Sequence, residues 1–150
     1  MTPRDLSDAF ADMPLTLKGI TSFFAVYGLG SFAVYGLGSV LLALAPGVEH
    51  TVAGQTFDQA GFFASGHGVL ALVIGAWLSA AALGLLQRAG WARWAAIAAW
   101  ALFVPAEQAL AESPRVALQA GLACAWALGV GAYLFRTRGA VGFFNRAAAS

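Results

Sequence analysis

Four stretches of this chain carry no Asp, Glu, Lys or Arg and consist mainly of apolar residues. These stretches cover residues 19–48, 60–87, 94–106 and 116–135. About 20 consecutive apolar residues in a helix cross the hydrocarbon core of a bilayer. The pattern therefore predicts an all-α polytopic membrane protein, an up-and-down bundle of four transmembrane helices. The predicted spans are about 16–44, 61–86, 91–111 and 116–135.

Composition supports a membrane protein built as a single domain over residues 1–150. Hydrophobic residues make up 60% of the chain and charged residues 10%, whereas soluble domains carry about 25% charged residues. The net charge of +1 provides no basic patch, so we expect the lipid bilayer as a partner and no nucleic acid. The single cysteine, Cys124, excludes membrane thiol–disulfide enzymes, because these need a cysteine pair.

The basic residues predict how the chain is oriented in the membrane. Of the eight Lys and Arg residues, seven lie in the N-terminal segment, the turn between the second and third spans, and the C-terminal tail. The other two connections hold only Arg115. By the positive-inside rule, both termini are expected to be cytoplasmic.

The first predicted span contains an octapeptide in two tandem copies. Phe24–Ser31 is repeated without change as Phe32–Ser39. With both copies a straight helix is about 12 Å longer than with one, so we predict one long helix that protrudes from the bilayer. Eight residues turn the helix so that the copies face about 80° apart, which argues against a repeated binding face. The alternative is that the glycines and serines form a close-packing seam for another helix.

Two segments outside the spans are predicted from local signals. Residues 2–13 are expected to form either a short surface helix or a frayed tail. Pro46 and Gly47 end the first span, and residues 48–59 are expected to form a loop.

Several short motifs carry a resemblance to a known family. They are Gly84–Trp94, Val104–Glu107, Tyr133–Leu134 and Leu17–Ile20. Together they resemble the small uncharacterised four-helix membrane proteins of bacteria, over about residues 18–138. The resemblance implies a four-helix bundle in the bacterial inner membrane. It implies no activity, because none is established for that family.

His67 is the first candidate for chemistry, because it is predicted to lie inside the second span between small neighbours. Imidazole is the usual axial ligand of haem, so His67 is a possible cofactor ligand, although no second histidine lies in a span to complete a bis-histidine site. The alternatives are another polar function, or a structural hydrogen bond to a neighbouring helix.

Glu107 is the second candidate, because an ionisable group within a span is costly and marks a functional hypothesis. Helix length places it about 6 Å below the outer surface of the membrane core. Pro105 frees a backbone carbonyl one turn earlier. The alternative is an interfacial glutamate that reaches water.

Gln119 is predicted at a depth similar to that of His67 and Glu107. We therefore expect these three residues to form a polar site on the outer side, which Gln108, Tyr35 and Ser39 could join. A hydrogen bond between His67 and Glu107 there could hold a proton or a small cation, or could pin the helices together. The helix faces are not fixed by the sequence, so this convergence is a hypothesis.

The spans lack the groups that catalysis or metal binding requires. We find no Cys/His cluster for a metal, no pair of intramembrane carboxylates and no Ser–His–Asp set. Small residues four apart in the fourth span, such as Ala125 and Gly129, permit close helix packing. We therefore expect a non-enzymatic protein that is an accessory or packing subunit of a larger membrane assembly, or a homo-oligomer. The alternatives are a small ion-coupled transporter that uses the outer polar cluster, and a haem- or pigment-binding protein that uses His67.

Overall fold

The computed structural model describes residues 3–37, 49–52, 55–110 and 115–145, and these are predominantly helical. Its α-helices are α1 (Pro3–Ala11), α2 (Leu15–Phe32), α4 (Gln59–Ala64), α5 (His67–Leu86), α6 (Gly90–Ala98), α7 (Val104–Leu110), α8 (Val116–Arg136) and α9 (Arg138–Asn145). Two π-helical turns are η1 (Ala33–Leu37) and η2 (Ala99–Phe103), and two strands are β1 (Glu49–Val52) and β2 (Gln55–Asp58).

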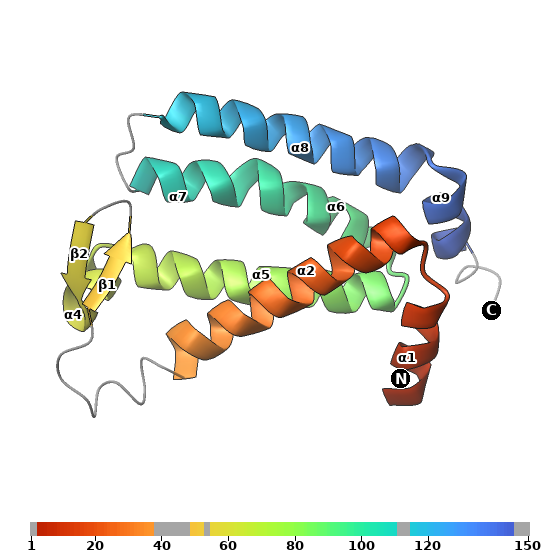
Figure 1. Ribbon diagram of the computed structural model, residues 1–150, viewed down its shortest axis with the longest axis horizontal. Coiled ribbons are helices and arrows are strands. Elements are labelled where there is room, and N and C mark those ends of the chain that lie inside the picture. Colours follow the sequence, from red (N-terminus) through yellow and green to blue (C-terminus); the bar gives the residue numbers. More distant parts are fainter. Residues whose placement is uncertain (1–2, 38–48, 53–54, 111–114, 146–150) are drawn as a thin grey trace.

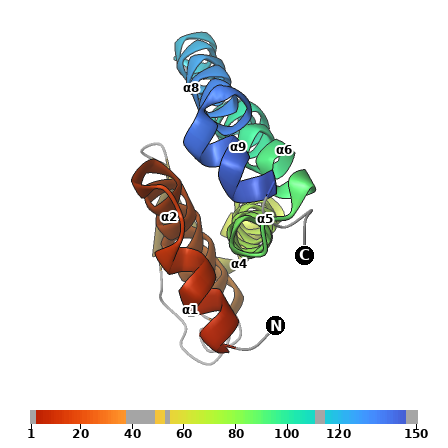
Figure 2. The ribbon, with the colours of Figure 1, turned by 90° about the vertical axis from the view of Figure 1, so that its right-hand side faces the viewer.

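The long helices lie roughly along one axis, with α1 and α9 at one end and the β-hairpin at the other (Figure 1). Helix α2 packs on α5, α5 packs on α6, and α8 packs on α6, η2 and α7. The end-on view shows α5 between α2 and α6, with α8 on the far side of α6 (Figure 2). A groove of about 480 Å³ lies between α2 and α8.

Three helices in the described residues are long and apolar enough to cross a membrane. They are Leu15–Tyr35, His67–Leu86 and Ala117–Arg136. Helical turns also continue from α6 through η2 to α7, across most of the third predicted span. A π-helical turn interrupts the α-helix there, immediately before Pro105, which has no backbone N–H to donate to the carbonyl of Ala101.

Glycines bring α2 and α5 into close contact. A Cβ added to Gly28 would lie 2.7 Å from the backbone nitrogen of Ser79, and one added to Gly75 would lie 2.9 Å from that of Phe32. Only glycine permits two helix backbones to approach this closely. The packing-seam interpretation of the octapeptide therefore holds for Gly28, whereas Gly30 has nothing within 4 Å.

The two copies of the octapeptide occupy different environments, as the predicted rotation requires. Phe24 in the first copy is 1% exposed, and its counterpart Phe32 is 49% exposed. The first copy is α-helical, and the second continues into the π-helical turn η1. The prediction that the helix extends to residue 44 concerns residues 38–44, which lie outside the described residues.

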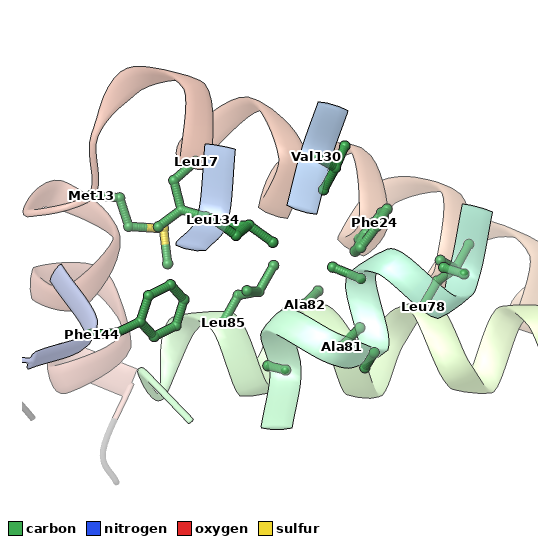
Figure 3. Close-up of a cluster of buried hydrophobic side chains, with 14 of the residues drawn as sticks. Met13, Leu17, Phe24, Leu78, Ala81, Ala82, Leu85, Val130, Leu134 and Phe144 are labelled. Atoms are coloured by element: carbon green, nitrogen blue, oxygen red, sulfur yellow. The ribbon is translucent and has the colours of Figure 1, made fainter. Parts of the chain in front are cut away.

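A closed hydrophobic core lies toward the α1 and α9 end of the bundle. Figure 3 shows side chains from α2, α5, α8 and α9, together with Met13 between α1 and α2, pointing toward one another there. The largest fully buried side chains include Phe24, Phe143, Leu17, Leu85 and Leu134. Residues 3–11 thus form a helix rather than a frayed tail, and Met13, which follows it, is buried in this core.

Within the predicted loop of residues 48–59, the described residues form two paired strands. Strands β1 and β2 pair antiparallel, with His50 opposite Phe57 and Thr51 opposite Thr56. The Asp58 carboxylate then accepts a hydrogen bond of 2.7 Å from the backbone N–H of Gly61 and caps α4.

The second long helix begins at His67, later than the predicted start near residue 61. Gly66 has a φ of 88°, a left-handed conformation that favours glycine and separates α4 from α5. The hydrophobic run across residues 61–66 concealed this break, because both segments are apolar. His67 is consequently the first residue of α5 and not two turns inside it.

Candidate polar site at the hairpin end of the bundle

His67 is held among aromatic rings where α5 meets the hairpin. Its ring centroid lies 5.2 Å from that of Phe57 on β2 and 6.2 Å from that of Phe62 on α4. His50 on β1 also stacks on Phe62, with a distance of 4.3 Å between the ring centroids. Tyr35 of η1 also stacks on Phe62, so the hairpin, α4 and the first span meet in one aromatic cluster.

Ser65 holds one nitrogen of the His67 ring. The Ser65 hydroxyl donates its single proton to the carbonyl of Phe62, at 3.0 Å. The 2.9 Å contact between Ser65 Oγ and His67 Nδ1 then has Nδ1–H as the donor. The other ring nitrogen, Nε2, is buried without a hydrogen-bond partner among the described residues.

His67 and Glu107 line the same cavity. His67 is the first residue of α5, and Glu107 lies on α7. This polar cavity of about 60 Å³ is bounded by α2, η1, β1, α4, α5 and α7, and its polar lining residues are Tyr27, Ser31, Tyr35, His67 and Glu107. Glu107 is half-buried and makes no hydrogen bond or ion pair with any residue that the structure describes. The direct hydrogen bond between the two residues is not formed, because Nε2 of His67 has no partner.

A second cavity adjoins the polar cavity and shares Tyr27, Ile74 and Glu107 with it. This aromatic cavity has a volume of about 180 Å³. Its aromatic lining residues are Phe23, Phe24, Tyr27, Trp100 and Phe103. Glu107 therefore lies at the junction of a polar space and an aromatic one.

Gln119 lines neither of these two cavities. It lies on α8, which packs on α6, η2 and α7, and α7 lies between α8 and α5 (Figure 1). Its side chain is partly buried, and its Oε1 has no hydrogen-bond partner among the described residues. Ser39 and the side chain of Gln108 lie outside the described residues.

The aromatic rings around Glu107 were not singled out from the sequence. Phe23 and Tyr27 stack with centroids 5.7 Å apart, and Phe23 stacks on Trp100 at 5.8 Å. In an apolar span such residues are indistinguishable from lipid-facing ones. The available signal was the spacing of Trp100, Phe103 and Glu107, because positions i, i+3 and i+7 share one face of an α-helix.

The space around His67 does not suit haem or a related pigment. Sites for sizeable ligands occupy about 300 Å³ or more, whereas the polar cavity has about 60 Å³. The rings of Phe57 and Phe62 also cover the imidazole. Within the described part of the chain, no group of three or more His, Cys, Asp or Glu residues could hold a metal ion.

Comparison with known proteins finds no matching family model, no matching curated protein and no matching solved structure. The resemblance to small four-helix bacterial membrane proteins therefore stays a prediction from the short motifs.

Proposed function

We propose that this chain is a non-enzymatic integral membrane protein that assembles with another membrane subunit or with a second copy of itself. In this proposal four spans cross the bacterial inner membrane as a single domain, with α6, η2 and α7 together forming the third. Both termini face the cytoplasm, because the basic residues gather at the α1 and α9 end.

The observation that carries the proposal is an unpartnered row of small residues on α8. Gly121, Ala125 and Gly129 are spaced four apart, so they lie on one face of the helix, and all three are exposed. A Cβ at Gly121 would meet nothing within 4 Å, and one at Gly129 would meet only the ring of Trp126 on the same helix. Such rows permit close approach of another transmembrane helix.

The bundle itself uses a different pair of small residues on α8. Ala127 is buried, and a Cβ added to Gly131 would lie 3.1 Å from Ile97 on α6. The internal packing of α8 is therefore satisfied by the Ala127 side of the helix. Gly121 and Ala125 are left for a partner, whereas Gly129 also lines the groove between α2 and α8.

Cys124 offers a direct test, because this single cysteine is exposed beside the row. Membranes that contain the native chain are treated with a short bismaleimide, and the products are separated by mass. We expect a cross-linked product, and we expect Ala125→Leu to reduce its yield severalfold because the larger side chain holds the helices apart.

The matched control is Gly30→Leu, which introduces the same side chain at an exposed glycine of α2 that has nothing within 4 Å. This variant should cross-link as the wild type does. Equal loss in both variants, or no product from the wild type, would contradict association through α8. The mass of the product distinguishes a second copy from another subunit.

A second candidate is a small ion-coupled transporter, favoured by the shared cavity of His67 and Glu107. It requires Glu107 to take up and release a proton from within the membrane. Dicyclohexylcarbodiimide, which attacks protonated carboxyl groups in apolar surroundings, should then add once to the wild type and not to Glu107→Gln. An unmodified wild type argues against this candidate.

A further inference from the structure

We propose that the aromatic cavity binds a hydrophobic organic cation of the ammonium type, with its charge against Glu107 and its apolar groups among the aromatic rings. The inference goes beyond assembly through α8, because this site is built by α2, α5, η2 and α7. It also gives the ion-coupled alternative a substrate class.

The lining of the aromatic cavity matches the chemistry of an alkylammonium group. Five of its lining residues are aromatic, and Glu107 adds a carboxyl group to the lining. The negative face of an aromatic ring attracts a cation, and cages of such rings are the recurrent binding sites for quaternary ammonium groups. Phe23, Tyr27 and Trp100 already form a continuous stack on one side of the cavity.

No basic side chain faces Glu107 across the cavities that it lines. Of the described residues that line the aromatic cavity, the polar cavity and the groove beyond them, none is Lys or Arg. A carboxyl group without a basic neighbour favours a cationic ligand and disfavours an anionic head group such as a phosphate.

The volume sets the size of the group that enters. An apolar protein cavity of about 150 Å³ accommodates one benzene molecule. At about 180 Å³, the aromatic cavity accommodates a group of comparable size, such as a trimethylammonium head or one ring. A ligand with a larger apolar part requires further space, which the adjoining groove provides.

A groove between α2 and α8 extends the aromatic cavity along the bundle. The groove has a volume of about 480 Å³ and shares Phe23, Phe24 and Trp100 with the aromatic cavity. Its other lining residues are almost all apolar and come from α2 and α8. A cation with an apolar tail therefore has a charged end at Glu107 and a place for its tail in the groove.

The test measures binding of phenyltrimethylammonium to the purified, detergent-solubilised protein by equilibrium dialysis. Its uncharged counterpart, tert-butylbenzene, has the same shape with carbon in place of nitrogen, and it serves as a competitor. We expect the wild type to bind the cation saturably, and we expect tert-butylbenzene to compete at least about tenfold less well.

Two variants locate the site. Glu107→Gln keeps the side-chain shape and should weaken binding at least about tenfold, because the buried charge partner is lost. Trp100→Leu should weaken it about tenfold through the loss of one ring face. Glu49→Gln on the hairpin and Trp94→Leu, whose ring is 65% exposed, are matched controls that should bind as the wild type does.

The result that overturns the proposal is the absence of saturable binding, or equal affinity in Glu107→Gln and the wild type. Equal competition by tert-butylbenzene would also overturn it, because the cavity would then select apolar shape and not charge. These outcomes are independent of cross-linking at Cys124. Binding without proton-coupled uptake in vesicles would remove support from the transporter candidate while leaving the cation site in place.

Discussion

Replacing Gly28 with alanine is expected to destabilise the bundle by about 2–3 kcal/mol. The added Cβ would lie 2.7 Å from the backbone nitrogen of Ser79 and 2.8 Å from its Oγ, and neither helix backbone can give way without opening the α2–α5 contact. Overpacking of this kind costs about 1–3 kcal/mol, and a backbone neighbour places it at the upper end. Thermal unfolding of the purified protein in detergent, with free energies from denaturant titration, measures the change.

Gly30→Ala is the matched control, because Gly30 lies in the same octapeptide and has nothing within 4 Å. Alanine there should be neutral or stabilising by up to about 1 kcal/mol, since glycine is the weaker helix former. Equal free energies of unfolding for Gly28→Ala and Gly30→Ala would contradict the close approach of α2 and α5 at Gly28.

The second large effect is expected for Phe143→Ala, outside the spans. Phe143 on α9 is fully buried, and the guanidinium carbon of Arg88 lies 4.6 Å from its ring centroid. Arg88 in turn forms an ion pair of 3.2 Å with Asp12, so the ring helps to hold α9, the middle turn and the end of α1 together. Truncation of a buried phenylalanine costs about 3–5 kcal/mol, and here we expect early cleavage of α9 in limited proteolysis.

Phe10→Ala provides the comparison for this prediction. Phe10 lies on α1 at the same end of the molecule, but its side chain is 37% exposed. Its removal should leave α9 protected and the stability nearly unchanged. Equal protease sensitivity of the two variants would contradict the packing of α9 as described.

The apolar pattern predicted the helical class well because long charge-free runs depend on overall hydropathy and not on the detailed packing. The positions of α2, α5 and α8 follow from these runs. The start of α5 did not follow, because the break at Gly66 is conformational and leaves the hydropathy unchanged. The hairpin was also not predicted. It pairs Glu49 with Asp58, and no turn motif in the sequence indicated this pairing.

The candidate site was predictable in depth but not in direction around the helix axes. Counting residues placed His67 and Glu107 at one end of the bundle, and both line the polar cavity. The same counting placed Gln119 with them, whereas α7 lies between α8 and that cavity. The spacing of Trp100, Phe103 and Glu107 places them on one helix face, but hydropathy alone does not show whether that face lines a cavity or points away from the bundle.

The central claim is that the chain is an integral membrane protein that works in an assembly. The most direct measurement is native mass spectrometry of the protein released gently from its own membrane, with every bound polypeptide weighed. The proposal predicts either several copies of the chain or a stoichiometric complex with another subunit, and it predicts that Ala125→Leu disrupts that species. A single chain that remains alone in wild-type samples would contradict it.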